Sequence, residues 1–135
     1  MAMQIKSKEV TVNCSSQEAF EYLNDMQNFK NLLPEDKITN WEAKEDYCSF
    51  KVQNAATIDM KLVGGNEFDL VKIESGVRSP FPFTLDIYIK DNGNGTCSGF
   101  QDFNGKVNPF LKMMVQKPLE TLFNHIADRL VEVKA

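Results

Sequence analysis

The sequence is poor in the residues that build metal sites and disulfide frameworks. It contains one histidine, His125, and three widely separated cysteines, Cys14, Cys48 and Cys97, without a CxxC spacing. Zinc and non-haem iron sites need several ligands of these types at close spacing, and disulfide frameworks use an even set of cysteines. We therefore expect no metal site, no cofactor, and reduced cysteines that pack as small hydrophobic side chains.

Long apolar runs and an excess of basic charge are also missing. No apolar stretch approaches the roughly 20 residues that span a membrane, and the first residues lack the features of a secretory signal. The 15 Lys and Arg residues are interspersed among 19 Asp and Glu residues, which gives a net charge of −4. Because nucleic-acid binding needs clustered basic side chains, we expect no nucleic-acid partner. The composition predicts one cytoplasmic domain over residues 1–135, without membrane insertion.

The clearest pattern lies at the C-terminus, where residues 108–135 contain no glycine. Apolar residues recur there at steps of three and four, which places them on one face of a helix. Asn108 suits the N-cap, Pro109 suits the first helical position, and Pro118 is predicted to kink the helix. The segment therefore predicts one long amphipathic helix. Its buried stripe is predicted to comprise Leu111, Val115, Leu119, Leu122, Ile126, Leu130 and Val133.

The N-terminal part predicts a strand followed by two short helices. Residues 5–14 alternate polar and apolar side chains, as expected of a strand. Ser15 and Glu18 then have the spacing of a capping box, which predicts a helix that ends near Asp25. A second short helix over residues 29–33 is expected to stop at Pro34.

The middle of the chain predicts strands joined by short turns. Alternation places Ile58 and Met60 on an apolar face, and Asp59 on a face exposed to water. Gly64-Gly65 is interpreted as a tight hairpin turn. The chain thus predicts an α+β fold with a curved antiparallel sheet of about seven strands around the long helix. The six middle strands are predicted at residues 38–43, 47–52, 57–63, 67–75, 83–90 and 97–107.

This order of elements resembles the helix-grip fold of the START-like superfamily, also called SRPBCC or birch-pollen-allergen-like. The matching segments are residues 12–20 (VNCSSQEAF), 31–34 (NLLP) and 108–114 (NPFLKMM), and the resemblance covers the whole chain. The most similar members are small bacterial single-domain proteins labelled polyketide cyclase/dehydrase or lipid-transport-like. The resemblance implies a cavity between sheet and helix that holds a lipid, sterol, polyketide or plant hormone. A minority of members are cyclases or dioxygenase subunits, so the fold does not decide the function.

Three hypotheses follow. In the first, the protein binds or transports a small hydrophobic ligand, lipid- or polyketide-like, in that cavity, as a monomer or weak homodimer and without catalysis. The alternative is a polyketide cyclase or dehydratase that uses general acid/base chemistry in the same cavity, and the third is an interaction protein with a filled cavity. No catalytic residue is assigned. The residues expected to contact a ligand are Phe50, Ile58, Met60, Leu62, Phe81, Phe83, Leu85, Gln101, Phe103, Phe110, Met114, Pro118 and Leu122.

Two polar side chains bear on these hypotheses. If Phe103 points inward, Gln101 does so too, and it donates either to a ligand oxygen or to the protein backbone. A register slipped by one residue would bring Asp102 and Asn104 inward instead. His125 lies on the shoulder of the apolar stripe, where we expect a helix-flank position without chemistry rather than an acid/base role.

Overall fold

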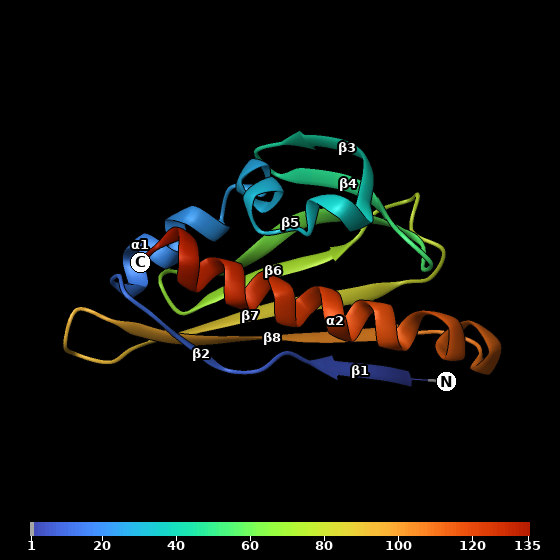
Figure 1. Cartoon of the computed structure of the whole chain (residues 1–135). Helices are drawn as coiled ribbons and strands as arrows, with labels where there is room; N and C mark the ends of the chain where they lie inside the picture. The colour runs from blue at the N-terminus through green and yellow to red at the C-terminus, as the bar shows by residue number, and fades with distance from the viewer. Residues whose placement is uncertain (1) are drawn as a thin grey trace.

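The computed structural model describes residues 2–135, which form one antiparallel sheet and a set of covering helices (Figure 1). Within this range the sheet has eight strands in the order β1-β8-β7-β6-β5-β4-β3, and β2 also pairs with β8. A long C-terminal helix crosses one face of the sheet. The elements are β1 (Ala2–Lys6), β2 (Val10–Val12), α1 (Ser16–Leu23), η1 (Met26–Asn31), η2 (Glu35–Lys37), β3 (Ile38–Lys44), β4 (Tyr47–Val52), β5 (Thr57–Asn66), β6 (Leu70–Ser75), β7 (Phe83–Asp91), β8 (Cys97–Lys106) and α2 (Pro109–Val133).

The alternation of side chains along β7 and β8 sets the inner face of the sheet. Leu85 and Ile87 of β7 are buried and pair directly with Phe103 and Gln101 of β8. Tyr88 points to the outer face and is 38% exposed. The predicted register is therefore confirmed, since Gln101 and Phe103 both face inward. An antiparallel sheet with one covered face produces this pattern.

The N-terminal strand differs from the prediction, because residues 5–14 do not form one strand. Ser7 ends β1 by using its side chain in place of a ladder bond: the backbone N–H of Gln101 donates to Ser7 Oγ at 2.9 Å. The next backbone N–H, that of Lys8, donates to Asn124 Oδ1 of α2 at 2.8 Å. The chain then returns to β8 as β2. Side-chain acceptors far along the sequence thus divide one predicted strand into two.

The Gly64-Gly65 pair was interpreted as a hairpin turn, and this prediction is wrong. Both glycines lie within β5, and the turn to β6 follows at residues 67–69. The register of β5 against β6 shifts between Leu62 and Gly64, and Gly64 has a φ of 136° that L-residues rarely adopt. A bulge with glycine increases strand twist. This irregularity, with a second register shift in β3, accompanies the curvature of the sheet.

The predicted exposure of Asp59 is also wrong. Asp59 does point to the outer face of β5, but it is only 1% exposed because the segment after β6 folds over it. The backbone N–H of Arg78 donates to Asp59 Oδ2 at 3.0 Å, and that of Gly76 donates to the Asp59 carbonyl at 2.7 Å. Ser79 Oγ makes two more bonds to the same residue: it accepts the N–H of Asp59 at 2.9 Å and donates to the Asp59 carbonyl at 3.0 Å. A polar residue buried in this way is retained by its hydrogen bonds.

The helices begin where their caps predict. Ser15 Oγ accepts from the N–H of Glu18 at 3.1 Å, and Asn108 Oδ1 accepts from the N–H of Leu111 at 2.8 Å. The second short helix is a 3-10 helix over Met26–Asn31, earlier than predicted. The long helix α2 continues on both sides of Pro118. Among the described residues, no helix combines the length and apolar character needed to cross a membrane.

Two blocks of helix share the inner face of the sheet. Helix α2 forms one block and packs against β1, β2 and β8. Helices α1 and η1 form the other, with α1 against β6, β7 and β8 and η1 against β3 and β4 (Figure 1). Side chains of both blocks and of the sheet meet in one hydrophobic core. The end of β4 and the η2 segment lie beside α2, and the candidate site lies between them.

Candidate ligand-binding site

Most of the side chains expected to contact a ligand fill the interior with one another. The rings of Phe83 and Phe103 lie 4.9 Å apart between their centroids, and those of Phe103 and Phe123 lie 5.0 Å apart. Phe81 adds an edge contact to Phe103 at 6.3 Å. These aromatic contacts connect β7 and β8 directly to α2. Little open volume therefore remains between sheet and helix at this point.

The remaining predicted residues lie in three places. Four are buried in the core, each at most 1% exposed, and Leu62 is half-buried beside them. Pro118 and Leu122 line a surface cleft on α2, whereas Phe110 and Met114 are exposed near the start of α2. The ligand-binding role of the whole set stays a prediction. The four core residues are Phe50, Ile58, Met60 and Leu85.

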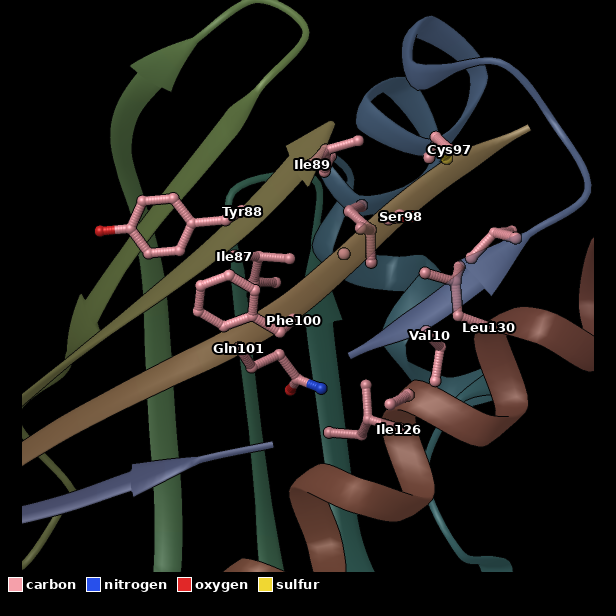
Figure 2. Close-up of a pocket in the computed structure, with 15 residues that line it drawn as sticks. Val10, Ile87, Tyr88, Ile89, Cys97, Ser98, Phe100, Gln101, Ile126 and Leu130 are labelled. Carbon is pink, nitrogen blue, oxygen red and sulfur yellow. The ribbon is translucent and has the colours of Figure 1, made fainter. Parts of the chain in front are cut away.

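A small apolar cavity lies between β8 and the C-terminal half of α2 (Figure 2). Ile87 projects from β7, Val10 comes from β2, and Ile126 and Leu130 project from α2. The cavity has a volume of about 20 Å³. One water molecule needs about 10–15 Å³ on the same measure, so this space accommodates a single water and nothing larger.

Gln101 is a buried polar side chain at this cavity. Its Nε2 donates to the carbonyl oxygen of Phe123 in α2 at 2.9 Å, so the side chain bonds the backbone, as one of the two interpretations held. Its Oε1 is buried and has no hydrogen-bond partner among the described residues. An unpaired buried carbonyl costs about 1–3 kcal/mol. Gln101 Oε1 is consequently an acceptor that is free to bind a water or a ligand donor.

A more open cleft, of about 390 Å³, lies between α2 and the η2 side of the sheet. Its apolar surface includes Val52 at the end of β4, and Pro118 and Leu122 of α2. Val52 and Leu122 are 4% and 2% exposed, so both belong to the core that forms the floor of the cleft. The other lining residues are Pro34, Asp36, Lys37, Gln53, Asn54, Lys117, Thr121 and His125.

The sequence predicted only part of this cleft. Pro118 and Leu122 were expected to contact a ligand, and Val52 was not included although it shares an inward face with Phe50. Residues 34–37 comprise Pro34 and the short 3-10 helix η2, and residues 53–54 form a turn, so no periodic pattern marks them as neighbours of α2. A positive φ of 62° at Asn54 gives the tight β4–β5 turn its shape, and the sequence signal for it was an Asn-Ala pair between strands.

The cysteines do not supply a reactive group. All three are free and buried. Burial, with a smaller contribution from the Asp59 charge, raises the pKa of Cys48 to about 12. Burial is also the main reason that the pKa of Cys97 is raised to about 11, with Cys14 next to it as the second cause. Thiols with such pKa values are protonated at neutral pH and are poor nucleophiles.

The described residues contain no group of three or more His, Cys, Asp or Glu side chains arranged to hold a metal ion. His125 is half-buried at the edge of the cleft, and Asp36 also lines it. No hydrogen bond connects these two side chains within residues 2–135, since neither side chain has one there. The cleft is thus an apolar groove with a polar rim.

Comparison with known proteins supports the fold. No family model matches the chain, and no curated protein matches it. Among solved structures, norcoclaurine synthase from Thalictrum flavum is similar with a TM-score of 0.73 and 12% identity over 98% of this chain and 86% of that one. A START superfamily protein from Mycobacterium smegmatis gives 0.69 and 13% over 97% and 96%. The protein XoxI from Bacillus cereus gives 0.66 and 11% over 98% and 94%. The chain therefore has the helix-grip fold of START-like (SRPBCC) proteins.

Proposed function

We propose that this protein binds a small hydrophobic ligand, lipid- or polyketide-like, between the sheet and the C-terminal helix. The observation that carries the proposal is the cleft of about 390 Å³ between Val52 of β4 and Pro118 and Leu122 of α2. Pockets for small molecules usually measure about 300–1,000 Å³, with mostly apolar walls and a few polar groups. The helix-grip fold adds support, because its members hold ligands between these same elements.

The cleft suits an amphipathic molecule with an apolar body. Val52 and Leu122 provide a floor that the rest of the core holds in place, so a ligand meets a preformed surface. Thr121 and His125 on α2 and Lys37 in η2 offer polar contacts at the rim. The apolar part would lie against the floor and the polar end would face the rim.

The expected affinity is modest. A ligand that buries about 200 Å² of apolar surface gains about 5 kcal/mol at about 25 cal/mol per Å². This free energy corresponds to a dissociation constant of about 0.2 mM before polar contacts are added. A fluorescent apolar probe such as ANS should therefore bind measurably, and decanoate or decanol should displace it.

A substitution that fills the cleft tests the proposal. Thr121 is exposed on α2 and lines the cleft, so Thr121→Trp should fold normally and place an indole over the floor. We expect this variant to lose ANS binding and decanoate competition. Asp128→Trp, also on an exposed position of α2 but outside the cleft, is the matched control and should bind as the parent does.

A second control addresses other apolar surfaces. Met113 is 83% exposed outside the cleft, and Met113→Ser should leave unchanged the part of ANS binding that decanol displaces. If Thr121→Trp binds ANS like the parent, or if the parent binds neither ANS nor decanoate, the proposal is wrong.

The alternative function, a cyclase or dehydratase, has less support. General acid/base catalysis needs a side chain within hydrogen-bond reach of the proton that it moves, usually held by a partner. His125 and Asp36 line the cleft without such a bond between them. If His125→Ala binds ANS and decanoate as the parent does, His125 is not needed for binding. A cyclase or dehydratase that uses His125 as its acid or base would instead lose its activity in this variant.

A further inference from the structure

The start of α2 carries three exposed apolar side chains. Phe110 is 72% exposed, Met113 is 83% exposed and Met114 is 48% exposed. The spacing of these residues, i, i+3 and i+4, places them on one face of the helix. The first turns of α2 lie at one end of the molecule, on the right in Figure 1. We call these three residues the apolar tip.

The tip is comparable in area to the largest exposed apolar patch of a typical monomer. With roughly 200 Å² for each fully exposed side chain, the three residues expose roughly 400 Å². The largest apolar patch of a typical monomer is about 300–600 Å² and is often functional. The neighbouring Leu111 and Val115 point into the protein, so the tip is not an unfolded end of the helix. It is a surface that the fold presents to the outside.

The segment that contains the tip is basic, although the protein as a whole is acidic. Between residues 103 and 119 there is no Asp or Glu, and the three charged residues are Lys106, Lys112 and Lys117. Lys117 lies on the same helical face as Phe110, Met113 and Met114, two turns from Phe110. No ion pair within residues 2–135 involves any of these lysines, unlike Lys8, Lys72 and the two arginines. The sequence therefore concentrates positive charge at one end of a chain with a net charge of −4.

We propose that the apolar tip and its three lysines dock the protein on an anionic membrane surface. Phe and Met side chains enter the boundary between headgroups and acyl chains, while Lys side chains pair with anionic headgroups above them. The first turn of α2 has no acidic residue, so the positive end of the helix dipole adds to the attraction. No membrane-crossing segment is needed for this mode of binding.

A second copy of this chain fits the tip less well. Two tips in contact would bring the basic ends of two copies together, with Lys117 of each on the contacting face, which is unfavourable. The roughly 400 Å² of the tip is also half of the about 800 Å² per partner that a stable interface buries. A charged lipid surface satisfies both the apolar and the basic side chains.

Vesicle binding tests the proposal on the full chain. We expect sedimentation with vesicles of phosphatidylcholine in which about one lipid in three is phosphatidylglycerol, and at least tenfold weaker binding to phosphatidylcholine alone. Because each lysine near an anionic surface contributes about fivefold, Lys106→Gln/Lys112→Gln/Lys117→Gln should weaken binding by about a hundredfold. About 0.5 M NaCl, at which the Debye length is about 4 Å, should do the same.

The apolar contribution is tested separately with Phe110→Ser/Met113→Ser/Met114→Ser, which should weaken binding at least tenfold without changing the melting temperature. Val63→Ser, at a 45% exposed position in β5, is the apolar control.

The charge control, Lys30→Gln/Lys44→Gln/Lys90→Gln, replaces three exposed lysines elsewhere. It changes the net charge of the protein by the same amount as the tip variant. Both controls should bind anionic vesicles nearly as the parent does. The proposal is overturned if the parent fails to bind them, if a control weakens binding as much as the tip variants, or if the tip holds a dimer that the serine variant dissociates. The cleft variant Thr121→Trp should still bind vesicles, which separates this proposal from the proposed function.

Discussion

Gly76 should not tolerate even a methyl group, because it lies directly against the buried carboxylate of Asp59. A Cβ atom at position 76 would lie 2.2 Å from Asp59 Oδ2 and 2.8 Å from its Cγ, far inside van der Waals contact. The carboxylate is 1% exposed and accepts the N–H of Arg78 at 3.0 Å, so displacing it would break that hydrogen bond in the interior. Gly76→Ala must therefore displace the whole segment that covers Asp59.

The cost follows from the bonds that this displacement breaks. The N–H of Gly76 donates to the Asp59 carbonyl at 2.7 Å, and the N–H of Arg78 donates to the carboxylate. A hydrogen bond to a charged group contributes about 1.5–3 kcal/mol, and overpacking costs about 1–3 kcal/mol. We expect Gly76→Ala to lower the free energy of unfolding by about 2–4 kcal/mol.

A double-mutant cycle measured by urea denaturation isolates this contact. Asp59→Ala alone should cost about 1–3 kcal/mol, because it leaves the Arg78 N–H without its acceptor. In the Asp59→Ala background, Gly76→Ala should cost less than about 0.5 kcal/mol, since the atom that it meets is gone. Additive costs for the two changes, or a stable Gly76→Ala single variant, would refute the reasoning.

Four further predictions concern the core. Gln101→Met should change the free energy of unfolding by less than about 1 kcal/mol, because one lost bond is offset by removal of an unpaired carbonyl; a loss above about 2 kcal/mol in urea denaturation would indicate a partner at Oε1. The pKa of Cys48 is raised to about 12, so the native state holds a proton that the unfolded state releases near pH 9, and stability should fall as pH rises from about 9 to about 12, less so in Cys48→Ala. Ile126→Asp should cost several kcal/mol and Asn124→Asp almost nothing in thermal melts, because Ile126 is 2% exposed. Met60→Trp should destabilise by about 1–3 kcal/mol, since Met60 is 1% exposed in packed surroundings; equal stability would indicate hidden space there.

The elements that depend on local sequence were predicted well. The cap at Asn108 and the apolar steps of three and four define α2, which begins at Pro109 as expected. Alternation along β7 and β8 identified the inner face, including Gln101 and Phe103. These features depend on residues within a few positions of one another, and a periodic pattern in the sequence detects them for that reason.

Two of the failures involve partners distant in the sequence. Asp59 looked solvent-exposed by alternation, but Arg78 and its neighbours cover it from 19 residues away. Ser7 divides the first strand because it meets Gln101, which lies 94 residues along the chain. Alternation along the sequence indicates which face of a strand a side chain lies on. It does not show which distant segment will fold over that face.

The candidate site divides in the same way. The sequence determined that α2 has an apolar face and a basic, apolar start, because both are patterns within one helix. Only the tertiary structure decided that the aromatic side chains of β7 and β8 fill the interior, and that a cleft opens beside Pro118 and Leu122. The physical reason is packing: whether apolar residues enclose a space or fill it depends on side-chain shapes that meet from several elements at once.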